Sequence, residues 1–326
     1  MTTVPEDATW VRFPRFVGDA VMQLPILRAL RSVADTPLVV WGPARTVILV
    51  AGTHLADAVW PESDRRTAWA LAGVLRRHRA SRSVHFPKSL RPALAAFLAR
   101  VPERLGVSES GAGLLNTHTA PFWKGSGTFL ERYRGVLVQR WPNLPALPFA
   151  EYEAPVEVNR PREPYVCLLP GASNPAKAWE ADHYRDLASL ARKEGLLPVI
   201  LGSPDESALG ISVLNGAAGM NLCGATDLRQ AAAWLSGSVG AVGNDSGLTH
   251  LAAACGTPTL ALFGATDPRA STPFGPRVRV MRRHDVPCSP CMLRQCTVLG
   301  HPCLSGLAAP AVWAAMKPML RAASMD

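Results

Sequence analysis

The chain has 326 residues, of which 48% are hydrophobic and 18% charged, and this composition predicts a sizeable core and excludes global disorder. No segment reaches the apolar length of a membrane span, and MTTVPEDATWVRF lacks the pattern of a signal peptide, so we expect a cytoplasmic protein. The net charge is +9, and residues 1–155 hold 19 Lys or Arg against 12 Asp or Glu. This excess favours an anionic partner for the first half, although an Arg-rich surface without a ligand would look the same. No basic run is interleaved with aromatic residues, so nucleic acid is not the expected partner.

The first predicted elements are a strand over residues 9–13, a turn over 14–18, and an amphipathic helix that begins at Asp19. Asp19 would then lie at a helix N-terminus, next to the carboxyl end of a strand. Ligands bind there in open α/β sheets. The pattern therefore makes Asp19 a candidate functional carboxylate, with an ordinary helix cap as the alternative.

Two later segments of the first half hold candidate ligand contacts. Residues 83–86 predict a strand, and Ser89 would cap the helix that follows it. Lys88 and Arg91 would lie near the start of that helix, where positive charge is unfavourable unless an anion is near, so we expect a phosphate there. His118 and Lys124 fall in a loop that leads into a helix, and they would contact a ligand or simply belong to the surface.

Six prolines between residues 141 and 164 break regular structure and predict an extended linker. We place the domain boundary there, between residues 1–155 and residues 156–326. Strands and helices alternate in the second half, as a doubly wound parallel sheet requires. The last element is a helix predicted over residues 307–323.

Three turns of the second half would face one crevice if the sheet is parallel. Residues 171–177 contain small residues and Lys177, residues 202–206 contain Glu206, and residues 244–250 open a helix. A nucleoside diphosphate needs positive charge, close backbone N–H donors and a carboxylate for its ribose, and these turns supply all three. A well-capped structural helix would explain the third turn equally well.

The stretch NDSGLTHLAAACGTPTLALFGATDP, residues 244–268, resembles the donor-binding signature of glycosyltransferase family 9, the bacterial ADP-heptose:lipopolysaccharide heptosyltransferases. PRFVGDAVM, residues 14–22, resembles the opening motif of the heptosyltransferase II branch. The resemblance implies the GT-B fold, in which two Rossmann-like doubly wound domains face a cleft. The first domain would bind the acceptor, the second the nucleotide sugar, and the last helix would pack back on the first domain.

The resemblance also implies a donor site. Ser173 and Lys177 would hold the diphosphate, and Glu206 the ribose, with Thr226 and Leu228 at the edge of the adenine. Ala172 departs from the family, because many relatives have a hydroxyl residue at this position.

Further along the same signature, Asp245 would bind hydroxyls of the sugar. The backbone of Ser246, Gly247 and Leu248 would lie beside the phosphates together with His250.

The implied reaction is an inverting transfer of heptose from ADP-heptose to a phosphorylated, lipid-linked sugar of the lipopolysaccharide inner core. Asp19 would take the proton of the acceptor, and Lys177 would stabilise the leaving diphosphate. The chain has no Asp-x-Asp pair, so we expect catalysis without a metal or other cofactor. The partners would be the donor, the anionic acceptor and, peripherally, the cytoplasmic face of the inner membrane. Another acceptor, such as a protein, and a non-catalytic nucleotide-sugar-binding protein remain as alternatives.

The chain has seven cysteines, of which Cys167, Cys223 and Cys255 lie singly in apolar surroundings and are expected in the core. The other four have the spacing C-x2-C-x4-C-x6-C and are Cys288, Cys291, Cys296 and Cys303. Four thiolates at this spacing would close a tetrahedral site for a structural zinc or iron ion. We rank reduced structural thiols slightly ahead of this metal site, and disulfides third for a cytoplasmic chain.

Overall fold

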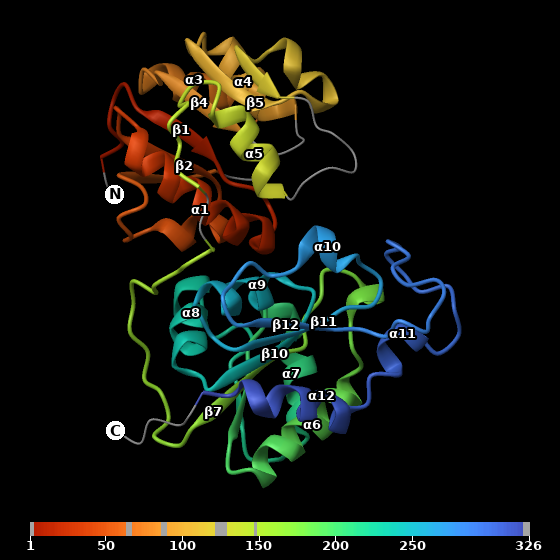
Figure 1. Ribbon diagram of the computed structural model, residues 1–326. Helices are drawn as coiled ribbons and strands as arrows, with labels where there is room; N and C mark the ends of the chain where they lie inside the picture. The colour runs from red at the N-terminus through yellow and green to blue at the C-terminus, as the bar shows by residue number, and fades with distance from the viewer. Residues whose placement is uncertain (1–2, 63–66, 86–89, 121–128, 147–148, 322–326) are drawn as a thin grey trace. The chain divides into compact units, whose positions relative to one another are not determined.

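The computed structural model describes residues 3–62, 67–85, 90–120, 129–146 and 149–321 (Figure 1). The chain divides into two compact units, residues 1–148 and 149–326, and each unit has a six-stranded parallel sheet with helices packed on it. Among the described residues, no helix combines the length and the apolar character needed to cross a membrane. The α/β class expected from the sequence is therefore present in both units.

The first sheet has the strand order β3-β2-β1-β4-β5-β6. Its strands are β1 (Thr9–Arg12), β2 (Leu38–Pro43), β3 (Ala58–Glu62), β4 (Arg82–His85), β5 (Glu103–Val107) and β6 (His118–Ala120). The helices are α1 (Val17–Val33), α2 (Ala44–Val47), α3 (Ala68–Arg77), α4 (Leu90–Leu98) and α5 (Phe129–Leu137), with 3-10 turns η1 (Ile48–Val50) and η2 (Glu109–Leu114). Every residue of β1 and β2 is buried, because helices cover both faces of a parallel sheet.

The helix α1 begins at Val17, two residues before the predicted start at Asp19. Phe16 has extended backbone angles and takes the N-cap position, so Asp19 is the third residue of the helix and not its cap. The order of the strands reverses between β1 and β4, and α1 follows β1. Asp19 is half-buried and lies at the carboxyl edge of this sheet, at the point where open α/β sheets bind ligands.

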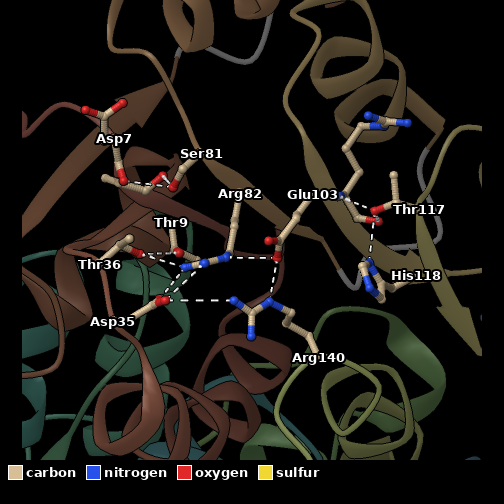
Figure 2. Close-up of polar contacts among 12 residues, drawn as sticks. Asp7, Thr9, Asp35, Thr36, Ser81, Arg82, Glu103, Thr117, His118 and Arg140 are labelled. Carbon is tan, nitrogen blue, oxygen red and sulfur yellow. Dashed lines mark hydrogen bonds and ion pairs between the residues drawn. The ribbon is translucent and has the colours of Figure 1, made fainter.

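A network of ion pairs lies at the amino ends of the strands of the first sheet, the edge opposite Asp19 (Figure 2). Arg82, the first residue of β4, donates to Asp35 Oδ2 at 3.2 Å and to Glu103 Oε2 at 2.9 Å. Arg140 donates to the same Glu103 oxygen at 2.7 Å. The bonds from Arg82 hold the pKa of Asp35 below its ordinary value. Burial alone would raise the pKa of Glu103, but Arg140 and Arg82 outweigh burial and lower it.

The second sheet has the strand order β12-β11-β10-β7-β8-β9. Its strands are β7 (Tyr165–Leu169), β8 (Leu197–Ile200), β9 (Met220–Asn221), β10 (Gly240–Asn244), β11 (Thr259–Leu262) and β12 (Val278–Met281). The helices are α6 (Ala181–Lys193), α7 (Ser207–Leu214), α8 (Leu228–Gly237), α9 (Gly247–Ala254), α10 (Pro268–Ser271), α11 (Pro302–Ser305) and α12 (Ala309–Met316), with 3-10 turns η3 (Pro175–Lys177), η4 (Pro204–Glu206) and η5 (Lys317–Met319). The order of these strands reverses between β7 and β10, which places the ligand-binding edge at the ends of those two strands.

The two ends of the second unit differ from the sequence prediction. The Tyr152 N–H donates to Ala254 O at 2.8 Å, so the chain joins the second unit before the predicted boundary at residue 155. The last helix, α12, ends at Met316, where we expected residue 323. We also expected it on the first domain, but Val312, Trp313 and Met316 lie in the core of the second unit, beside α6. These apolar side chains follow helical spacing and bury one face of α12 there.

The amino-edge network predicts a pH-dependent loss of stability. Arg82→Met removes the bonds from Arg82 to Asp35 and Glu103 and leaves Arg140 as the cation near both carboxylates. We expect the free energy of unfolding to fall by about 2 kcal/mol at pH 7. Both carboxyl pKa values are lower in the folded chain, so this stabilisation is present above the ordinary values of 3.8 and 4.5 and is lost as the pH falls below them. Urea unfolding of both proteins at several pH values measures it.

Arg79→Met is the matched control, because Arg79 is 67% exposed and its ion pair with Glu6 is 3.4 Å long. The control should change stability by about 0.5 kcal/mol or less. Equal losses in the two variants would contradict a special role for the network.

Candidate active site

A buried carboxylate joins the carboxyl ends of three strands in the second sheet. Asp245 follows β10, Lys177 lies in the loop after β7, and Thr266 follows β11. Lys177 Nζ donates to Asp245 Oδ2 at 2.7 Å, and Thr266 Oγ1 donates to the same oxygen at 2.7 Å. We call these three residues the Asp245 cluster. They lie at the predicted ligand-binding edge.

The surroundings of Asp245 keep it ionised although its side chain is only 4% exposed. Burial alone would raise the pKa of Asp245, but the neighbouring His250, Lys177 and Thr266 lower it to about 2. The Nε2 atom of His250 lies 3.8 Å from Oδ1. Four side chains that the sequence separates by up to 89 positions therefore meet around one negative charge.

Asn244, the last residue of β10, holds the neighbouring loop in place. Its Oδ1 accepts from the Trp179 N–H at 3.0 Å and from the Tyr184 hydroxyl at 3.2 Å. Its Nδ2 donates to Pro170 O at 2.7 Å. All these groups are buried, and a buried polar group without a hydrogen-bond partner lowers the stability of the fold. Because the Asn244 amide pairs them, it fixes the path of the chain between β7 and α6.

The helix α9 has its N-cap directly after Asp245, and this cap gives the first N–H groups no side-chain hydrogen bond. Ser246 takes the N-cap position with extended backbone angles, but its side chain makes no capping hydrogen bond. Its hydroxyl lies 3.2 Å from Thr249 Oγ1. The backbone N–H groups of Gly247 and Leu248 belong to the first turn of α9, where an anion is favoured.

Glu206 lies against two glycines at the ends of neighbouring strands. Its Oε2 accepts from the Ser203 N–H at 2.7 Å and so fixes the side chain. A Cβ atom on Gly171 would lie 2.1 Å from Glu206 Oε1, and one on Gly202 would lie 2.8 Å from Oε2. Both positions therefore require glycine if the carboxylate is to lie beside the loop after β7.

Thr226 and Leu228, the residues predicted beside the adenine, are half-buried at the start of α8. This segment comes close to Glu206, because the Gly224 N–H donates to Gly202 O at 3.0 Å. The structure thus gathers the predicted ribose and adenine residues at adjoining strand ends.

Ser173 is exposed and lines a cavity of about 440 Å³. The other wall of this cavity is formed by residues 293–297, which belong to a segment that we call the cysteine-rich segment, residues 286–305. The Ala176 N–H donates to Arg294 O at 3.2 Å, and His301 Nε2 lies 3.1 Å from Ala176 O. The segment also reaches the loop after β11, where the Met292 N–H donates to Ala265 O at 2.7 Å.

The four clustered cysteines come near one another in this segment. Cys303 is buried, and burial raises the pKa of its thiol, as do the thiols of Cys296, Cys288 and Cys291. Within the described part of the chain, however, no three His, Cys, Asp or Glu residues have the arrangement that would hold a metal ion. The geometry therefore does not support the structural metal site, which stays a prediction for elemental analysis to test. Cys167 and Cys223 are buried in the core, as expected, and Cys255 is half-buried.

Of the predicted acceptor residues, Lys88, Ser89 and Lys124 lie outside the described residues. Arg91 donates to Glu62 Oε1 at 2.6 Å, and the Glu62 side chain is fully buried. His118 begins the edge strand β6, with its Nδ1 3.0 Å from the hydroxyl of Thr117 (Figure 2). An acceptor role for these residues stays a prediction.

Sequence reasoning missed Thr266 and the contacts of the cysteine-rich segment. Thr266 lies in the turn that follows the buried strand β11, four residues after the strand ends, so its signal was weaker than that of Asp245, which directly follows β10. The contact of His301 with Ala176 had no such signal, because the two residues are 125 positions apart.

Residues 68–301 match the family model of glycosyltransferase family 9 (heptosyltransferase), which is more than half of the chain. The chain belongs to glycosyltransferase family 9. It is 30% identical over 302 residues to lipopolysaccharide heptosyltransferase 2 of Escherichia coli K12, covering 82% of this chain and 86% of that protein. The sequence resemblance is thus confirmed.

Solved structures of the family share the fold of this family 9 chain. The E. coli ADP-heptose lipopolysaccharide heptosyltransferase II matches with a TM-score of 0.81 and 25% identity, over 96% of this chain and 98% of that one. An E. coli heptosyltransferase solved with ADP matches with a TM-score of 0.74 and 19% identity, over 96% and 99%. The predicted GT-B fold class, with its two Rossmann-like domains, is confirmed.

The Asp245 cluster predicts the effect of a single hydroxyl. Thr266→Val keeps the shape of the side chain but removes one donor to Asp245. We expect the pKa of Asp245 to rise from about 2 toward 3.8 and stability at neutral pH to fall by about 1 kcal/mol. A carboxyl NMR titration and urea unfolding measure the two effects.

Thr272→Val is the control, since the Thr272 hydroxyl is exposed and donates to Pro268 O. It should leave the pKa of Asp245 unchanged. An unchanged pKa in Thr266→Val as well would mean that the hydroxyl does not stabilise the carboxylate.

Proposed function

We propose that this chain transfers heptose from ADP-heptose to a phosphorylated, lipid-linked sugar of the lipopolysaccharide inner core, with inversion at the anomeric carbon. The observation that carries the proposal is the Asp245 cluster at the reversal point of the second sheet, beside the free N-terminus of α9. The family members that the chain resembles are lipopolysaccharide heptosyltransferases, which supports the sugar and the acceptor class.

The donor would bind along the carboxyl edge of the second sheet. Lys177 and the N–H groups of α9 face the negative charge of the diphosphate. Glu206 accepts from the ribose hydroxyls, next to Thr226 and Leu228 at the adenine. Asp245, held ionised, accepts from hydroxyls of the heptose.

In the transfer, the acceptor hydroxyl oxygen forms a bond to the anomeric carbon while the bond from that carbon to the diphosphate oxygen breaks. The electron pair of the broken bond moves to the diphosphate, where Lys177 and the start of α9 stabilise it. Asp19 of the first domain takes the proton of the acceptor hydroxyl. A cation and backbone donors meet the charge of the leaving group, so the proposed step uses no metal ion.

The proposal places the enzyme in the cytoplasm, peripherally on the inner membrane, where a lipid-linked acceptor is exposed. The positive excess of residues 1–155 suits an anionic acceptor on the first domain. Lys88, Ser89, Arg91, His118 and Lys124 are its candidate contacts.

The role of Asp19 predicts a loss of turnover without a loss of donor binding. Asp19→Asn removes the proton acceptor but keeps the size of the side chain. We expect transfer from ADP-heptose to fall by roughly 10²–10⁴-fold while the Kd for ADP stays as in the wild type. Transfer assays and calorimetry measure the two quantities.

Asp182→Asn is the control, because the Asp182 carboxylate is 80% exposed. Near-normal turnover of Asp19→Asn would leave Asp19 a structural residue.

The donor site predicts weaker ADP binding for two variants. Lys177→Ala removes a cation from the diphosphate, and Glu206→Gln keeps the bond to Ser203 but loses the charge toward the ribose. Each change should cost about 1–3 kcal/mol of ADP binding, measured by calorimetry. Lys193 and Asp205 are exposed and serve as controls, so the variants Lys193→Ala and Asp205→Asn should bind ADP normally. Unchanged affinity in both test variants would place the nucleotide elsewhere.

A further inference from the structure

The cysteine-rich segment exposes four large apolar side chains within eight residues. Met292 is 64% exposed, Leu293 44%, Val298 43% and Leu299 99%. We call residues 292–299 the apolar tip. Figure 1 shows this part of the chain as a loop at the margin of the second unit, next to α11. Apolar side chains gathered on one exposed loop usually mark an interaction site.

The backbone around the apolar tip is anchored, so these side chains cannot simply fold inward. The Met292 N–H donates to Ala265 O at 2.7 Å, and the Arg294 carbonyl accepts from Ala176. The Ser289 hydroxyl donates to Gly264 O at 2.7 Å. These bonds hold the apolar tip outward. The bond to Ala176 also braces the loop after β7, residues 170–180, which we call the donor loop.

The charge near the apolar tip is positive. Residues 282–301 contain Arg282, Arg283 and Arg294 but only one acid, Asp285. Asp285 is paired with Arg283. Arg294 is exposed, and its guanidinium has no hydrogen bond or ion pair with the residues that the structure describes. The surface thus combines apolar side chains with an unpaired cation, which fits an anionic partner.

The size of the patch decides between a protein and a lipid surface. A stable protein interface buries roughly 800 Å² and about 20–30 residues on each side, far more than one eight-residue loop presents. A membrane interface has no such minimum, because a few apolar side chains enter the headgroup region while basic residues stay at the anionic surface. The apolar tip matches the second case.

We propose that the apolar tip inserts into the headgroup region of an anionic membrane and so holds the donor loop at the lipid surface. That this brings the donor to a lipid-linked acceptor rests on the proposed function; membrane binding itself does not.

Sedimentation with vesicles tests the proposal on the full chain. Wild-type protein should bind vesicles of phosphatidylethanolamine and phosphatidylglycerol more tightly than vesicles of phosphatidylcholine alone. The double variant Val298→Ser/Leu299→Ser should bind the anionic vesicles roughly tenfold or more weakly, since it loses two inserted side chains. Ile211→Ser is the matched control, because Ile211 is 64% exposed in α7 of the same unit, and it should bind as the wild type does.

ADP affinity and thermal unfolding of the double variant should equal those of the wild type, which shows that the fold and the donor site are intact. Wild-type vesicle binding by the double variant would overturn the proposal. The proposal would also be overturned if light scattering found the wild type to be a dimer and the double variant a monomer. The patch would then be a contact between two copies of the chain. Absence of heptose transfer together with the expected vesicle results would overturn the proposed function and leave membrane docking standing.

Discussion

The negative charge of Asp245 is the constraint on which the second unit depends. A carboxylate with 4% of its side chain exposed is unfavourable unless donors surround it. Lys177, Thr266 and His250 meet this need, and they come from the loop after β7, the loop after β11 and the helix α9. These loops are therefore fixed relative to one another before any ligand binds, and a preorganised site loses less free energy on binding.

Two further layers keep the Asp245 cluster in place. Asn244 ties the chain after β7 to the end of β10 through one buried amide. The cysteine-rich segment then closes over the outside of the same loop, through both backbone groups of Ala176. A four-thiolate metal site would be one means of holding such a segment, but here backbone hydrogen bonds already do so. The clustered cysteines thus belong to the frame of the donor loop, whether or not an ion joins them.

The sequence contained most of the fold, because buried parallel strands are continuous apolar runs between glycine and proline turns. It also placed Asp19 and Asp245 at the carboxyl edges of the two sheets, because polar residues in the segments that follow such strands gather at one edge. The start of α1 could not be predicted from the sequence, because Phe16 takes the N-cap position without a capping side chain. The spacing of the cysteines limits how far apart the thiols lie, but it does not determine whether they converge. Contacts such as that of His301 with Ala176 depend on the packed fold and leave no local pattern.

The two sheet edges show why one set of ion pairs is structural and the other suits a ligand. At the amino edge of the first sheet, Arg82 divides its donors between Asp35 and Glu103, so its fixed fork is already used (Figure 2). Lys177 differs, because an ammonium has three N–H donors and the bond to Asp245 uses one of them. Lys177 can therefore keep Asp245 ionised and hold a diphosphate at the same time. In the proposed function, the donor would therefore add an anion to the site without leaving a buried carboxylate unpaired.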